Sequence, residues 1–160
     1  MNRLRQLLLE TRTGLLGFHA TPETALANIG KSLREEDIPG VVDELDSIHS
    51  KWEELEKEDS SDREPIDALY ECSSEIDRVL RSVDHVPAAP FFVGLASPHA
   101  MTRWSMAETV ARLSTVSDLP RLQELLLGEQ DKQVRTSLQA AVDRLSRQSS
   151  QRTRQWWQFW

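Results

Sequence analysis

The 160-residue chain is poor in the residues that break regular structure or form covalent crosslinks. It contains only 6 glycines and 7 prolines, which argues against a turn-rich all-β fold. Its single cysteine, Cys72, excludes an intramolecular disulfide and a zinc site built from cysteines. Because such cysteine use suits a reducing compartment, we expect a cytoplasmic protein.

Long apolar runs are also missing. The first residues begin like a signal peptide, but Glu10 and Arg12 interrupt the apolar run before it reaches a useful length. No stretch approaches the roughly 20 apolar residues of a membrane span. With 39% hydrophobic and 28% charged residues, the composition is typical of a soluble globular protein. We therefore expect a soluble chain that is long enough to bury one core.

Motifs for catalysis and metal binding are absent as well. The glycines stand alone, so there is no phosphate-binding loop, and no Gly-x-Ser-x-Gly elbow occurs. The four histidines are scattered and are expected at the surface. Asp46 and His49 are spaced to face one another on a helix, but two ligands do not make a metal site. We expect no catalytic residue, no cofactor and no metal, and we favour a protein that is not an enzyme.

The charge is negative overall and unevenly distributed. The net charge of −7 weighs against nucleic acid as the main partner, because phosphate binding needs a cationic surface. Between Asp43 and Glu64 there are ten acidic residues and only three basic ones. From Arg144 onward the chain carries four arginines and no acid. The chain thus has an acidic middle and a basic C-terminal segment.

Apolar residues recur three and four apart along most of the chain, which predicts helices. Thr21 and Pro22 form a favourable helix start, because the hydroxyl can cap the first turn and proline fits the first helical position. Residues 58–63 are expected to form a solvated loop and residues 86–90 a proline-containing connector. The short apolar run 91–95 is compatible with a strand or a short helix. The seven expected helices cover about 2–16, 21–37, 39–55, 64–83, 97–113, 118–128 and 131–147.

One segment of the chain repeats itself at an offset of about 32 residues. Sliding 91–95 onto 123–127 also brings Arg103 onto Arg135 and Val110 onto Val142. The better copy has a first helix with Leu119-Pro120 near its start. A turn with the pattern Asp-x-x-Val-Arg at 131–135 follows, and then a second helix with small and branched apolar residues. The length and pattern resemble a HEAT repeat, best over residues 118–147 and partially over residues 90–117.

The resemblance implies an all-α fold in which antiparallel helix pairs stack as a right-handed α-solenoid. It favours a short solenoid of about seven helices, and an orthogonal helical bundle is the alternative. It also implies that Arg103, Val134 and Arg135 hold neighbouring turns together. Second helices line the concave surface in this family, so the resemblance favours exposed second-helix residues for partner contact. These candidates are Trp104, Glu108, Arg112, Gln139 and Asp143.

The last residues form a basic and aromatic segment, which we separate as 149–160 from a single helical domain at 1–148. Four of its last five residues are aromatic, and exposing so many aromatic side chains favours association. This segment has three interpretations: it covers an end of the stack, it docks into a partner or a second copy, or it lies in a membrane interface. Its candidate contact residues are Arg152, Arg154, Trp156, Trp157, Phe159 and Trp160.

These features favour a non-catalytic protein-interaction module, an adaptor or an inhibitor of the immunity-protein type, that binds through its second helices, its acidic helix or its aromatic segment. The expected partner is a protein with a basic patch, because an acidic surface steers such a partner. A homodimer through the C-terminal segment is also considered. One alternative is a HEAT-like DNA-binding or base-repair enzyme that is similar to the alkyl-purine DNA glycosylases and uses Arg103, Trp104, Arg112 and Arg135. Another alternative is a peripheral membrane adaptor anchored through 152–160.

Overall fold

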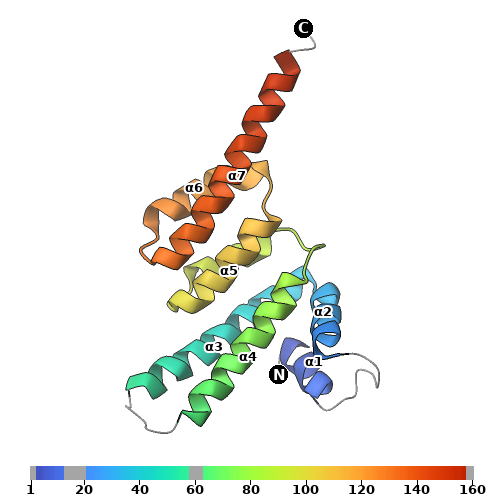
Figure 1. Ribbon diagram of the computed structural model, residues 1–160, viewed down its shortest axis with the longest axis vertical. Helices are drawn as coiled ribbons and strands as arrows, with labels where there is room; N and C mark the ends of the chain where they lie inside the picture. The colour runs from blue at the N-terminus through green and yellow to red at the C-terminus, as the bar shows by residue number, and fades with distance from the viewer. Residues whose placement is uncertain (1–2, 13–20, 58–62, 158–160) are drawn as a thin grey trace.

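The computed structural model describes residues 3–12, 21–57 and 63–157, and these residues form an all-helical protein without strands (Figure 1). Among them are seven α-helices and three short 3₁₀ helices. The α-helices are α1 (Arg3–Arg12), α2 (Pro22–Ser32), α3 (Ile38–Lys57), α4 (Glu64–Arg81), α5 (Ala100–Leu113), α6 (Leu119–Gly128) and α7 (Lys132–Trp157). The 3₁₀ helices are η1 (Glu35–Asp37), η2 (Ala89–Ala96) and η3 (Val116–Asp118). The all-α prediction is confirmed.

The start of α2 is the one predicted, but its end is not. The Thr21 hydroxyl accepts a hydrogen bond from the Thr24 amide at 3.3 Å, as an N-cap should. The helix ends at Ser32 rather than near residue 37, and the acidic residues 35–37 form the separate turn η1. Acidic side chains oppose the dipole at a helix C-terminus and favour it before an N-terminus. These acidic residues are therefore better placed directly before the N-terminus of α3 than at the C-terminus of α2.

The apolar run 91–95 is helical, as the repeat alignment predicted, but it lies in the 3₁₀ helix η2 rather than in an α-helix. Gly94 allows η2 to approach α5, because a Cβ atom there would lie 2.2 Å from Cγ of Met106. The following helix, α5, begins at Ala100 and not at 97. Ser97 is extended, and its hydroxyl donates to the Asp46 carboxylate at 2.6 Å, which holds it outside the helix.

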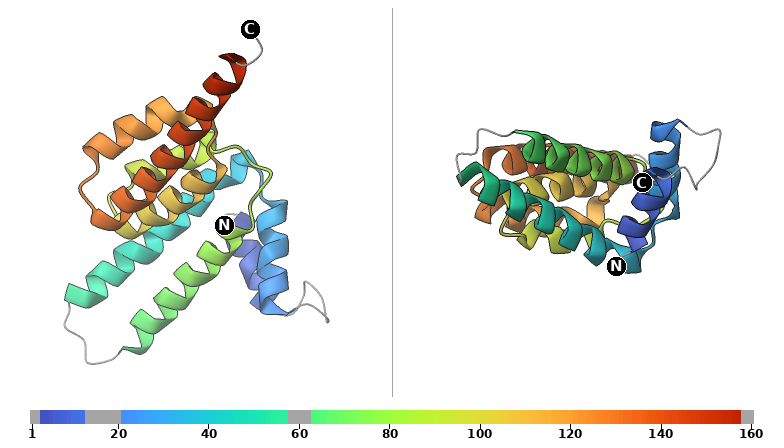
Figure 2. Two further views of the ribbon diagram at one scale, coloured as in Figure 1. Left: turned by 45° about the horizontal axis from the view of Figure 1, so that its top comes forward. Right: turned by 90° about the horizontal axis from the view of Figure 1, so that it is seen from below.

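The last helix is longer than predicted. We expected it to end near residue 147, because Leu145 is the last residue of the apolar pattern, but α7 continues to Trp157. No glycine or proline follows Gly128, so nothing in this sequence interrupts the backbone hydrogen bonds. The final turns of α7 extend past all other helices in Figures 1 and 2. Residues 13–16 and 58–62, expected as a helix end and a loop, lie outside the described residues.

The helices from α3 onward stack in pairs. Each first helix (α3, η2 or α6) packs against the second helix that follows it (α4, α5 or α7), and successive second helices lie side by side in chain order. Helix α2 also packs against α4, and α1 packs against α2 and α3. One continuous cluster of buried apolar side chains runs from Leu4 in α1 to Leu145 in α7. Within the described ranges, no helix is both long enough and apolar enough to cross a bilayer.

Candidate functional site

A pocket of about 250 Å³ lies between the second helices α4 and α5. Three of the predicted contact residues, Trp104, Glu108 and Arg112, are spaced four apart on α5 and line it together. From α4, the pocket is lined by Asp77, Leu80 and Arg81, and Ser105 and Thr109 complete the α5 wall. Trp104 is half-buried and also packs against the core.

Asp77 is the pocket carboxylate with the most perturbed environment. Burial raises its pKa above the ordinary value, and the nearby Glu108 carboxylate acts in the same direction. A hydrogen bond from Ser105 and the charge of Arg81 oppose this shift without cancelling it. An additional hydrogen-bond donor or cation would therefore stabilise the charged form of Asp77 in the α4 wall.

Arg112 is committed to the protein itself. Its guanidinium donates to the carbonyl of Leu80, in the last turn of α4, at 2.8 Å and to the carbonyl of Val83, just beyond the helix. The Leu80 carbonyl also accepts from the Val83 amide at 3.1 Å, and the arginine adds a charged donor to this helix end. Burial lowers the pKa of Arg112. The side chain thus forms a wall of the pocket and joins α5 to α4.

The boundary between α5 and α7 has an equivalent arginine contact. Arg144, 32 positions after Arg112, donates to the carbonyls of Ala111 at 2.7 Å and Ser114 at 3.0 Å. The Ser137 hydroxyl, 32 positions after Ser105, donates to the Glu108 carboxylate. Two successive boundaries are therefore each joined by an arginine that donates to carbonyls of the preceding unit. The sequence alignment did not identify either contact.

The arginines of the repeat pattern also make intramolecular bonds. Arg103 pairs with both carboxylate oxygens of Glu129, at 2.9 and 3.1 Å, and donates to the carbonyls of Ser97 and Pro98. Arg135 donates to the carbonyls of Leu126 and Glu129. Val134, the third residue of the repeat pattern, is fully buried in the core.

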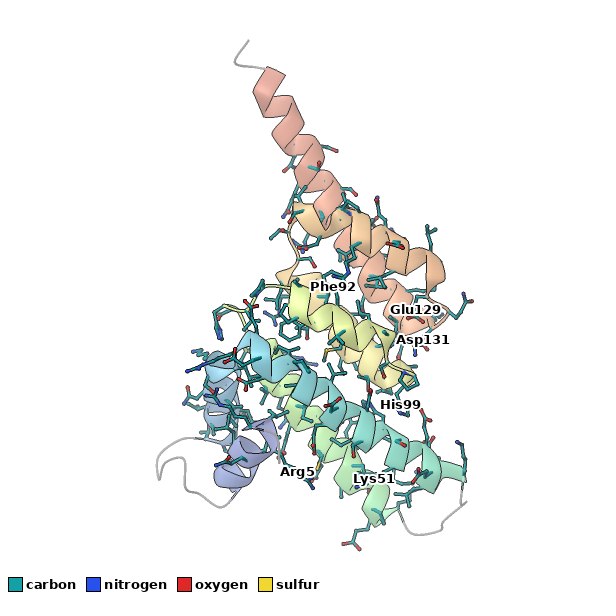
Figure 3. The ribbon with its side chains drawn as sticks, turned by 180° about the vertical axis from the view of Figure 1, so that it is seen from behind. Arg5, Lys51, Phe92, His99, Glu129 and Asp131 are labelled. Atoms are coloured by element: carbon teal, nitrogen blue, oxygen red, sulfur yellow. The ribbon has the colours of Figure 1, made fainter. Side chains whose placement is uncertain are left out.

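Glu129 connects these arginine contacts to the turn between α6 and α7. Burial alone would raise its pKa, but the bonds from Arg103 and from the amides of Asp131 and Gln130 outweigh burial and lower it. The amide of Asp131 donates to this carboxylate at 2.8 Å, and Figure 3 shows the two acidic residues together at this turn. Glu129 thus fixes the start of α7 against α5.

Gln139 and Asp143 are on α7 and do not reach the α4–α5 pocket. The Gln139 side-chain amide donates to the Asp143 carboxylate at 2.8 Å. Both line a separate open hollow between α6 and α7, together with Leu126, Lys132 and Thr136. The predicted contact residues therefore occupy two places along the second helices. Of the C-terminal candidates, the side chains of Arg152, Arg154, Trp156 and Trp157 and all of Phe159 and Trp160 lie outside the described residues.

His49 is a polar site that the sequence reasoning placed wrongly. It was expected at the surface, but only 2% of it is exposed. Its Nδ1 lies 2.9 Å from the Thr102 hydroxyl in α5, and its Nε2 lies 3.1 Å from the Ser73 hydroxyl in α4. Burial and the nearby His99 lower its pKa to about 4, although Asp46 and Glu53 act in the opposite direction. The signal was available, because His49 follows Leu45 by four residues on the apolar face of α3.

His99 differs from His49 in being at the rim of the structure. Its Nδ1 lies 3.0 Å from the Glu53 carboxylate of α3, and this hydrogen bond lowers the pKa of Glu53. Among the described residues, no group of three histidine, cysteine or acidic side chains has a geometry suited to a metal ion. His19 lies outside the described residues.

Comparison of the chain with protein-family models, with curated proteins and with solved structures finds no match.

Proposed function

We propose that this protein is a non-catalytic interaction module of the HEAT-like type, and that a protein partner binds along the second helices α4, α5 and α7. The observation that carries the proposal is the recurrence of an arginine-to-carbonyl contact at two successive boundaries between second helices. Stacks of such repeated units present extended surfaces and commonly act by binding. The second helices supply such a surface here.

The α4–α5 pocket suits one side chain of that partner. Its volume of about 250 Å³ is below the range of roughly 300–1,000 Å³ that is usual for small-molecule sites. Trp104 offers a half-buried aromatic wall, and aromatic residues in pockets often anchor protein interfaces. The first helix pair is strongly acidic, since α3 carries six acidic and two basic residues and α4 five and two. A partner with a basic patch therefore fits best, and an inhibitor of a basic enzyme is one concrete form.

The contacts of the arginines weigh against a nucleic-acid groove. Such a groove was considered around Arg103, Arg112 and Arg135, but all three guanidinium groups donate to carbonyls or to a carboxylate of this chain. Phosphate binding would have to compete with these bonds. A surface whose cations are engaged internally is better suited to recognising another protein.

Quantitative affinity capture from the host extract tests the proposal with two matched variants. Gln139→Lys adds a positive charge to the second helix α7, and Gln123→Lys makes the same change on the first helix α6; both side chains are exposed. We expect capture of the partner to fall with Gln139→Lys and with Trp104→Ala, and to persist with Gln123→Lys. Equal capture by all variants, or loss with Gln123→Lys alone, would contradict the proposed surface.

A further inference from the structure

The first helices η2 and α6 enclose a hollow on the side of the molecule that faces away from the second-helix surface. Both helices lie behind α5 and α7 in Figure 1 and in front of them in Figure 3. The η2–α6 hollow has a volume of about 530 Å³. Its apolar lining comes from Leu95 and Ala96 of η2, Leu125 of α6 and Leu138 of α7. The hollow is therefore separate from the α4–α5 pocket and from the residues expected to contact the protein partner.

The two helices beside the η2–α6 hollow also carry exposed apolar side chains. Leu127 of α6 is 84% exposed, the highest value for a large apolar side chain among the described residues, and Val93 of η2 is 52% exposed. Val93 lies three residues before Ala96, and residues three apart in a 3₁₀ helix are on the same side. Apolar side chains exposed beside an apolar hollow are typical of a surface that binds another chain.

Two charged side chains of α6, Arg121 and Glu124, line the same hollow. Neither forms an ion pair with another residue in the described ranges. The guanidinium carbon of Arg121 lies 4.2 Å from the centroid of the Phe92 ring in η2. At about 100° per residue around the helix, the α6 residues that face the hollow lie to one side of Glu124, and Leu127 lies to the other. This η2–α6 face thus combines a hollow, a projecting leucine, a cation and a carboxylate.

We propose that the η2–α6 face is a homodimer interface, in which Leu127 of each copy inserts into the η2–α6 hollow of the other. A two-fold interface requires both halves of every contact on one surface, because each copy supplies the same patch. The η2–α6 face meets this requirement for the leucine and the hollow, which flank Glu124. It also meets it for the charges, since Arg121 and Glu124 lie one helical turn apart.

The arrangement of these groups sets the direction of the symmetry axis. A two-fold axis that runs along α6 beside Glu124 brings Leu127 of one copy over the hollow of the other. The same axis brings Arg121 of each copy to Glu124 of the other, so two ion pairs form. A different protein would need only one half of each contact. The presence of both halves on one face identifies a second copy as the occupant.

Sedimentation equilibrium of the full chain at low salt tests the pair. Leu127→Glu places a charge in the apolar hollow, and Arg121→Glu brings like charges together in both symmetric contacts. We expect the unmodified chain to dimerise, and each variant to raise the dimer dissociation constant roughly tenfold or more. The double variant Arg121→Glu/Glu124→Arg exchanges the charges and should restore dimerisation. Lys31→Glu makes the matched charge change at an exposed residue of α2 and should have no effect.

Three results would overturn the pair: a monomeric unmodified chain, an unchanged dissociation constant for Leu127→Glu, or a double variant that associates as weakly as Arg121→Glu while both show helical circular dichroism. A mass that keeps rising above two chains would also contradict a closed two-fold pair. None of the variants alters α4, α5 or α7, so loss of dimerisation and loss of partner capture are separable results.

Discussion

The two boundaries between successive second helices are built to one plan but packed differently. Between α5 and α7, the helices have the most extensive contact in the molecule, whereas α4 and α5 touch at few places and leave a pocket. Thr109, which lines the pocket at the open boundary, is matched 32 positions later by the smaller Ala141, which is buried.

The open boundary is held by a polar contact that the closed one lacks. His49 of the first helix α3 lies within hydrogen-bond distance of hydroxyls of both α4 and α5. The position equivalent to Thr102 in α7 is Val134, which is buried in the apolar core. One boundary thus depends on direct packing of its two helices, and the other depends on a buried imidazole. The two should respond differently to acid and to changes of side-chain volume.

The largest expected effect is acid destabilisation of the open boundary. Because the pKa of His49 falls from 6.5 to about 4 on folding, its contribution is complete above pH 6.5 and is lost as the pH falls towards 4. The loss amounts to about 3 kcal/mol. Urea unfolding between pH 7 and pH 4 should show it in the unmodified chain and not in His49→Gln, whose amide retains a donor and an acceptor. Parallel pH profiles for the two chains would show that another group is responsible.

Removing the arginine contacts should cost nearly the same at both boundaries. Arg112→Met and Arg144→Met each leave two carbonyls without a charged donor, and we expect each to lower the free energy of unfolding by about 1.5–3 kcal/mol. Chemical denaturation measures both. A large loss for one variant and none for the other would show that the shared plan is not energetically equivalent.

A larger side chain should destabilise the closed boundary more than the open one. Ala141→Leu inserts three carbon atoms into the closed boundary, where Ala141 is 2% exposed, and should cost about 1–3 kcal/mol. Thr109→Leu, at the equivalent position of the open boundary, adds one non-hydrogen atom and removes a hydroxyl that donates to the Ser105 carbonyl at 3.0 Å. Because Thr109 lines the pocket, we expect a change below about 1 kcal/mol in thermal or urea unfolding. Equal destabilisation would mean that the pocket does not accommodate a larger side chain.

The smallest effect concerns the two carboxylates that accept serine hydroxyls. The raised pKa of Asp77 means that its charge opposes folding, so stability falls as the pH rises from the unfolded to the folded value. Asp77→Asn should therefore slightly increase stability at pH 7. The matched change Glu108→Gln, at an exposed residue, should stay within about 0.5 kcal/mol of the unmodified chain. A destabilised Asp77→Asn would indicate that the carboxylate makes a contact that the amide cannot replace.

Local signals gave the sequence analysis most of its success. The start of α2 could be predicted because a cap and a proline act within one turn, and the helices could be predicted from apolar spacing. Trp104, Glu108 and Arg112 were candidates because the resemblance places second helices at the partner surface, and the three line one pocket. Their opposite wall could not be predicted, since Asp77 meets Ser105 only through the packing of α4 against α5.

Two errors came from judging residues by type or by burial. His49 was treated as a surface residue because histidine is polar, although its spacing matched the apolar face of α3 and its hydroxyl partners lie 24 and 53 positions away. The end of α7 was placed at the last apolar core residue. A helix needs a backbone without interruption and tolerates turns without core contacts, so the absence of glycine and proline was the better signal.

Because α7 is continuous, it also fixes the direction in which the segment after Leu145 faces relative to the helical stack. Each residue of an α-helix turns the chain by about 100°, so one residue inserted after Leu145 would swing every later side chain by that angle. Seven inserted residues would return the segment to within about 20° of its original direction, displaced by about 10 Å. The direction in which this segment faces therefore depends on the number of residues that precede it in α7, in addition to its own sequence.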